Sequence, residues 1–94
     1  MGYRHIVLFR VHDTVEEHDV AHAVDQLTSL AGLPGITSWQ IARSLDDRKG
    51  RIIIEEAEFT DADAFAAFRS DPRHQSVAAQ MAAISDWWIG DRLS

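Results

Sequence analysis

The chain has 94 residues, 46% of them hydrophobic and 26% charged, and carries a net charge of −6 at neutral pH. This composition is typical of one small globular domain, here residues 1–94, and excludes a disordered chain. The absence of cysteine excludes disulfides, thiolate nucleophiles and cysteine-based zinc sites, and the negative charge argues against a nucleic-acid partner.

No apolar run approaches the roughly 20 residues that cross a bilayer. The first residues lead directly into a strand, without the pattern of a signal peptide. We therefore expect no membrane partner and a cytoplasmic location.

The first predicted strand, residues 3–11, is apolar on both faces. Side chains alternate along a strand, so Val7 and Phe9 point one way while Ile6 and Leu8 point the other. The helices of so small a chain can cover only one of these faces. A second copy of the chain is the simplest cover for the other face, which predicts a homodimer.

A first helix is expected from about residue 15, because Thr14 and Glu17 fit a capping box with Thr14 as the N-cap. Hydrophobic residues recur along it at 3.6-residue spacing and predict a buried stripe: Val20, Ala23, Val24, Leu27, Leu30 and Ala31. The turn at 32–35, with its proline and two glycines, ends this helix.

Two strands are predicted next, at 36–43 and 51–59, separated by a polar loop at 46–50. The strand at 36–43 alternates between apolar and polar residues, as a half-buried strand does. The strand at 51–59 carries apolar residues on both faces and so resembles the first strand.

A second helix is expected to begin at the N-cap Thr60, with Phe68 on its inner side. Asp71 as a new N-cap and Pro72 at the first helical position then restart the helix, which continues to about residue 83.

With a last strand at 84–93, the element order is β-α-β-β-α-β. This order predicts an α+β, ferredoxin-like fold, in which both helices cover one face of a four-stranded antiparallel sheet. The bare face would carry a hydrophobic patch from the first and third strands: Ile6, Leu8, Ile52 and Ile54. Pairing with the same patch of a second copy would bury it.

Three segments together resemble the stress-responsive dimeric α/β-barrel (Dabb) family: the opening His5–Phe9, the strand entry Leu33–Ile36 and the helix restart Asp71–His74. The resemblance covers nearly the whole chain and implies ferredoxin-like protomers that pair into a dimeric α/β barrel. Most members of the family have no assigned reaction. Its plant polyketide (olivetolic acid) cyclases close the ring of a linear polyketide by an aldol step without a cofactor.

The resemblance to the cyclases implies catalytic roles for two histidines. His74 matches the histidine of a late Pro-x-His motif, and His5 is the other histidine that carries over. The sequence departs from the cyclase pattern at three positions. Phe68 replaces an assisting tyrosine, Ile53 a further cavity histidine, and Asp71 the first histidine of the motif.

The residues themselves leave two interpretations open for each histidine. His5 could be a general base, since an ordinary imidazole titrates near neutral pH, or a core histidine bonded to the backbone. His74 lies in the first turn of a helix, where the dipole keeps the ring neutral and basic, or it merely packs beneath that turn.

Glu55 shares its face of the strand at 51–59 with Ile53 and Phe59, so it should point beneath the helices. A carboxylate there needs a partner, and His5 on the neighbouring strand could supply one. A bulge or a register slip would instead turn Glu55 outward.

Glu55, Phe68 and Trp39 are the expected ligand contacts. Glu55 is expected from its place beneath the helices and Phe68 from the cyclase position that it matches, while Trp39 could form part of an aromatic wall, which suits a flat apolar ligand. The alternative for Trp39, Trp87 and Trp88 is packing in the core or at an interface.

His18 and His22 have the i, i+4 spacing of a metal pair, but they lie on the polar face of the first helix without a third ligand. No metal site is expected there.

We therefore expect a small homodimer that binds a small apolar or aromatic organic molecule between sheet and helices. His74 and His5 would perform acid–base chemistry of the cyclase or lyase type on it, without a cofactor. Two alternatives stay open: a non-catalytic stress-responsive or assembly protein, and a cofactor-free monooxygenase, a reaction that related barrels host.

Overall fold

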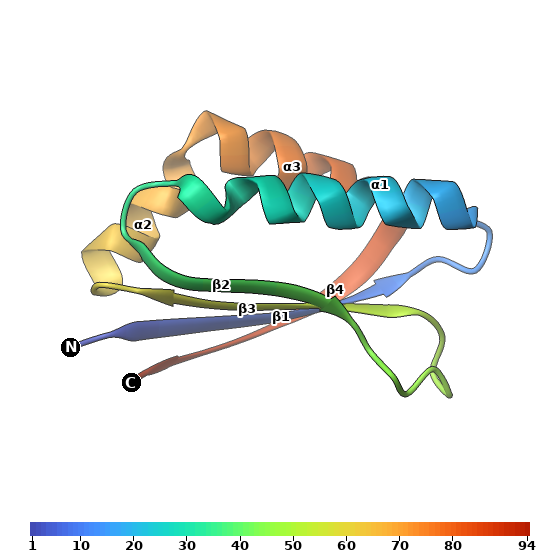
Figure 1. Cartoon of the computed structure of the whole chain (residues 1–94), viewed down its shortest axis with the longest axis horizontal. Coiled ribbons are helices and arrows are strands. Elements are labelled where there is room, and N and C mark those ends of the chain that lie inside the picture. Colours follow the sequence, from blue (N-terminus) through green and yellow to red (C-terminus); the bar gives the residue numbers. More distant parts are fainter.

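The computed structural model describes all residues from Met1 to Ser94. Figure 1 shows the elements in chain order: β1 (Tyr3–Val11), α1 (Glu17–Thr28), a short 3-10 turn (Ser29–Gly32), β2 (Ile36–Arg43), β3 (Ile52–Phe59), α2 (Ala62–Ser70), α3 (Pro72–Ile84) and β4 (Ser85–Leu93). The predicted β-α-β-β-α-β order is confirmed, with the second helix divided into α2 and α3.

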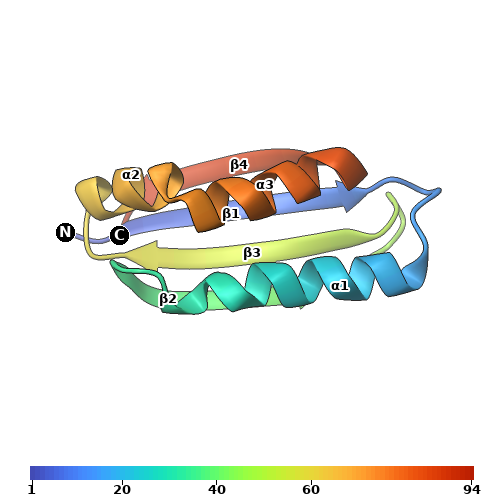
Figure 2. The same ribbon diagram turned by 90° about the horizontal axis from the view of Figure 1, so that it is seen from above.

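The four strands form one antiparallel sheet in the order β2-β3-β1-β4. All the helices lie on one face of it: α1 runs along β2 and β3, while α2 and α3 lie over β1 and β4 (Figures 1 and 2). This is the ferredoxin-like arrangement that the sequence predicts. None of the helices is long and apolar enough to span a membrane.

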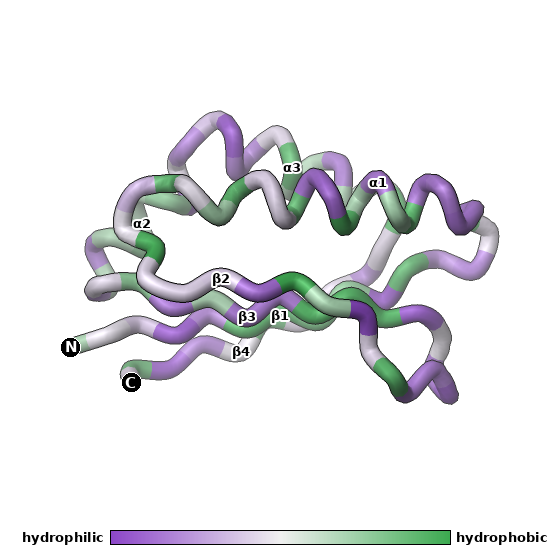
Figure 3. Tube along the Cα trace, viewed as in Figure 1, coloured by the Kyte–Doolittle hydropathy of each residue, from purple (hydrophilic) through white to green (hydrophobic).

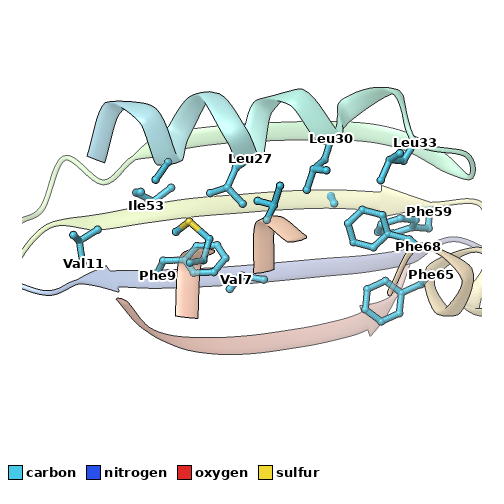
Figure 4. Close-up of a cluster of buried hydrophobic side chains, with 14 of the residues drawn as sticks. Val7, Phe9, Val11, Leu27, Leu30, Leu33, Ile53, Phe59, Phe65 and Phe68 are labelled. Carbon is cyan, nitrogen blue, oxygen red and sulfur yellow. The ribbon is translucent and has the colours of Figure 1, made fainter. Parts of the chain in front are cut away.

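The hydrophobic core fills the space between sheet and helices (Figure 4). Along α1, hydrophobic positions alternate with hydrophilic ones at helical spacing (Figure 3), and Val20, Ala23 and Leu27 are buried. At the α2 end of the core, Phe59, Phe65 and Phe68 contact one another, with ring centroids between 4.9 and 6.3 Å apart. These aromatic contacts fix α2 against the end of β3.

The outer face of the sheet carries the predicted hydrophobic patch. Leu8 is 40% exposed there, and Ile6, Ile52 and Ile54 are half-buried. The register of β4 adds Trp88, which pairs with Leu8 and is 61% exposed. We call these five residues the outer patch.

The predicted start of the first helix is wrong. The helix begins at Glu17 after Glu16, and no side chain caps it. Glu17 does not reach back to Thr14, because its carboxylate pairs with Arg43 and Arg51, which extend from the neighbouring strands. A full ion pair with two guanidinium groups competes successfully with a single backbone N–H.

The cap of the second helix lies one residue later than predicted. Asp61, not Thr60, is the N-cap of α2, and its carboxylate accepts a 2.8 Å hydrogen bond from the backbone N–H of Ala64. Thr60 lies at the end of β3 and not in the helix, because its backbone N–H donates a hydrogen bond to the carbonyl of Gly35. The prediction for α3 is confirmed: Asp71 caps it by accepting from the N–H of Arg73, and Pro72 opens it.

Candidate functional site

A cavity of about 350 Å³ lies between the sheet and the helices. Eleven of its sixteen lining residues are hydrophobic, so its walls favour an apolar ligand. Trp87 and Ile89 line it from the edge strand β4 and remain 46% and 58% exposed. The cavity is therefore open to solvent on the β4 side.

The cavity has an apolar end and a polar end. Phe9 and Trp87 are paired across β1 and β4, and with Met81 of α3 they form the apolar end. The polar groups gather at the other end, beneath the α2–α3 junction: Tyr3, His5, Glu55, Arg69, His74 and Asp91. At about 3.3 Å per strand residue, His5 and Phe9 are separated by roughly 13 Å along β1.

His5 is buried and held between two carboxylates. Its Nδ1 donates a 2.7 Å hydrogen bond to Oδ1 of Asp91 on β4, and its Nε2 lies 3.2 Å from Oε2 of Glu55 on β3. The sheet register produces this arrangement, because His5 pairs with Asp91 on one side, and Glu55 pairs with Val7, the next helix-facing residue of β1, on the other. Adjacent strands thus supply both partners of the buried ring.

The two carboxylates determine the protonation of His5. Burial alone would lower its pKa, but the hydrogen bonds to Glu55 and Asp91, together with their negative charges, outweigh that effect and raise the pKa above the ordinary histidine value. His5 therefore holds a proton more tightly than a free histidine does.

Asp91 also binds a second residue of β1. Its Oδ2 accepts a 2.6 Å hydrogen bond from the hydroxyl of Tyr3, and this bond raises the pKa of Tyr3. The Tyr3 ring stacks on Phe65 of α2 with centroids 4.5 Å apart. Both oxygens of Asp91 are thus occupied by protein groups.

His74 has the opposite environment. It is half-buried in the first turn of α3, with its ring 4.3 Å from that of Phe68. Burial lowers the pKa of His74 and leaves the ring neutral. Its Nδ1 lies 3.3 Å from the carbonyl oxygen of Arg69. A carbonyl can only accept, so Nδ1 carries the hydrogen and the lone pair belongs to Nε2.

Glu55 is 4% exposed and lies beneath the helices, as the alternation of its strand predicts. His5, the partner that the sequence suggests, is the side chain it contacts. The other carboxylate oxygen, Oε1, is bonded to no protein group, and Glu55 lines the cavity. A ligand in the cavity could therefore bond to that oxygen.

The structure does not bring Phe68 and Trp39 to the cavity. Phe68 is 2% exposed and packs inside the core, and Trp39 lies against it with centroids 5.7 Å apart. The indole N–H of Trp39 donates to the carbonyl of Leu27. Their position differs from the expected ligand wall because Trp39 packs beneath α1 and the Phe68 ring packs toward Trp39 and Phe59, away from the cavity along β1 and β4.

Three polar residues of the site were missed in the sequence: Tyr3, Asp91 and Arg69. For Asp91 a signal exists, because residues 85, 87, 89 and 91 share one face of the last strand. Trp88 and Ile89 are apolar neighbours on opposite faces, however, so the pattern alone does not say which face is inside. Arg69 offers no such signal, because a basic residue in the last turn of a helix is common on any surface.

His18 and His22 are exposed on α1, and the nearest acidic partners of His18 are Glu16 and Asp19. The chain contains no group of three or more His, Asp or Glu side chains arranged to hold a metal ion.

The fold is shared with several solved structures. A dimeric ferredoxin-like protein of unknown function from Thermobifida fusca is 27% identical, with a TM-score of 0.89 over 100% of this chain and 92% of that one. The hydroxynitrile lyase of Passiflora edulis is 18% identical, with a TM-score of 0.85 over 99% and 93% of the two chains. SnoaB, a cofactor-independent oxygenase from Streptomyces nogalater, is 21% identical, with a TM-score of 0.81 over 99% and 92%.

The two enzymes share the fold with this chain and perform different reactions, so fold alone does not assign an activity. No curated protein matches the chain in sequence. The model of the stress-responsive A/B barrel domain matches residues 3–92, nearly the whole chain. The resemblance found in the sequence is thereby confirmed, and the chain belongs to the stress-responsive A/B barrel domain (Dabb) family.

Proposed function

We propose that the protein is a homodimer that binds a small, mainly apolar organic molecule and performs cofactor-free acid–base chemistry on it. One observation carries the proposal. A single cavity contains two histidines whose pKa values are shifted in opposite directions, that of His74 downward by burial and that of His5 upward by two carboxylates that outweigh its burial. A pair of titratable groups separated in this way is suited to act as base and acid at one pH.

His74 is the proposed base. Its neutral ring has a lone pair on Nε2, while Nδ1 is held by the carbonyl of Arg69. It would remove a proton from a carbon next to a carbonyl group of the ligand. The resulting enolate can attack a second carbonyl, as in an aldol ring closure, or the same step in reverse can break a carbon–carbon bond.

His5 is the proposed acid, the group that donates a proton later in the reaction. Both of its ring nitrogens face carboxylates, so it does not abstract a proton itself. Glu55 connects it to the cavity through its free oxygen Oε1. A proton passed from His5 through Glu55 would neutralise the alkoxide formed by the attack, so the proton gained by His74 balances the one lost by His5.

The outer patch supports the homodimer. It is a hydrophobic surface on the sheet face that no helix of the chain covers. Burying it against a second copy would contribute about 25 cal/mol for each Å² of apolar area, before the cost of association. The Thermobifida fusca structure and a relative from Bacteroides fragilis, 17% identical, are both dimeric.

The chemistry can be tested before a natural substrate is known. In D₂O, a base that reaches a ligand in the cavity should catalyse exchange of the α-protons of a benzyl ketone such as phenylacetone. NMR measures this exchange directly. We expect the wild-type protein to accelerate exchange above the buffer rate and His74→Gln to remove most of this acceleration. His12→Gln is the matched control, because His12 is 40% exposed in its side chain and does not line the cavity.

Equal exchange with His74→Gln and wild type would refute His74 as the base. No acceleration by the wild type, together with no ligand retained in native mass spectra of the purified protein, would favour a non-catalytic stress-responsive or assembly role.

A further inference from the structure

Arg69 is the one arginine or lysine that lines the cavity. It belongs to the last turn of α2, directly before the junction at which α3 begins. It lines the cavity together with Tyr3 and His74, so Arg69 belongs to the polar end. The cation and the proposed base therefore share one end of the site.

Arg69 has no carboxylate partner. Every other arginine except Arg92 pairs with one within 4.0 Å: Arg4, Arg10, Arg43, Arg48, Arg51 and Arg73. The cavity does contain carboxylates, but both oxygens of Asp91 are bonded to His5 and Tyr3, and Glu55 contacts His5. The donors of the Arg69 guanidinium are thus unused by the protein.

We propose that Arg69 binds the anionic head of the ligand, and that the ligand class is an amphipathic organic acid with an apolar body and a carboxylate. This inference rests on the proposed function and names its substrate class. A guanidinium presents paired donors in a plane, which match the two oxygens of a carboxylate. The apolar body then extends along β1 toward Phe9, Met81 and Trp87.

The arrangement also has a chemical use. With its carboxylate on Arg69, the ligand is held at the end of the cavity where Nε2 of His74 is available. The same positive charge would stabilise negative charge that develops on a nearby oxygen when His74 removes a proton. Recognition and catalysis would thus depend on one side chain.

The test compares two probes of the same shape, 2-naphthoate and the neutral 2-naphthamide, by calorimetric titration at neutral pH. Charge-assisted hydrogen bonds to one guanidinium correspond to roughly a tenfold to a hundredfold preference for the acid. We expect this preference in the wild type. In Arg69→Gln the affinity for the acid should fall to that for the amide, while the amide binds as before.

Two variants complete the experiment. Arg92→Gln is the matched control, because Arg92 also has no carboxylate partner but lies outside the cavity, and it should keep the full preference. Arg69→Lys keeps the charge without the paired donors and should show an intermediate preference. It also replaces Arg69→Gln as the test if a thermal melt shows that the glutamine variant is unfolded.

Equal affinity for acid and amide in the wild type would overturn the inference, as would an undiminished preference in Arg69→Gln or Arg69→Lys. If the probes bind equally while His74-dependent ketone exchange persists, only the role of Arg69 fails. If neither probe binds and no exchange occurs, the proposed function fails with it.

Discussion

His5 and Asp91 lie opposite each other on β1 and β4, and Nδ1 of His5 is 2.7 Å from Oδ1 of Asp91. This contact joins the first and last strands of the chain at the polar end of the cavity. Asp91 also accepts from Tyr3, so one carboxylate orients the buried imidazole and the phenol. The polar end of the cavity therefore depends on the register of the last strand.

The first prediction concerns this contact. Asp91→Ala should lower the free energy of unfolding by about 1 to 3 kcal/mol, because it leaves a buried ring nitrogen without its partner. Denaturant unfolding at neutral pH measures the change. Asp86→Ala is the control, since Asp86 pairs with His12 on the exposed surface at 3.5 Å and should change stability by less than about 0.5 kcal/mol. Equal effects of the two substitutions would contradict the structural role of Asp91.

The second prediction is a pH dependence of stability. The pKa of His5 is higher in the folded chain than the ordinary value of about 6.5 that it has when unfolded. The folded state thus binds the proton more tightly, so the stabilisation is complete below about pH 6.5 and is lost as the pH rises through the folded pKa. Thermal melts of wild type and His5→Gln from pH 5 to 9 should show a stability difference that shrinks over this range.

His74 contributes to the pH dependence with the opposite sign. It is present in both proteins, so the effect of its burial, the largest cause of its lowered pKa, cancels in the comparison, and only the part due to the charge of His5 differs. A difference that stays constant, or that grows with pH, would show that His5 is not held protonated by its neighbours.

The third prediction tests the outer patch. Leu8→Glu should convert a homodimer into monomers or cause precipitation, because it introduces a charge at the centre of the buried apolar face. Light scattering coupled to size-exclusion chromatography measures the mass. Leu45→Glu is the matched control, because Leu45 is fully exposed in the β2–β3 loop and its replacement should leave the dimer intact. A stable wild-type monomer at micromolar concentration would contradict the proposed assembly.

The sequence predicted the elements of the fold well because each is encoded locally. Alternation defines β1 and β3, helical spacing defines α1, and Asp71 with Pro72 marks the start of α3. The same alternation indicated that Glu55 lies inside with His5 as one partner it could have, while a bulge or register slip that would turn Glu55 outward stayed open. The contact needs no information beyond the pairing of β1 with β3.

What the sequence could not predict depends on long-range geometry. Asp91 enters the site only through the register of β4, where a slip of one residue would turn it outward. Trp39 and Phe68 were expected at the ligand, but the packing of Trp39 beneath α1 and of Phe68 against Trp39 and Phe59 places both in the core. Glu17 was expected to cap its helix, and two distant arginines bind it instead.

The central claim is that His5 and His74 share one cavity but differ in protonation at the same pH. A titration of the ring protons of all five histidines by NMR measures this directly, with His5→Gln and His74→Gln to assign the signals. We predict that His74 titrates below the ordinary histidine range and His5 above it, because burial lowers the pKa of the former, and two carboxylates outweigh burial and raise that of the latter. If both titrate together near pH 6.5, or His74 titrates above His5, the acid–base account of this cavity is contradicted.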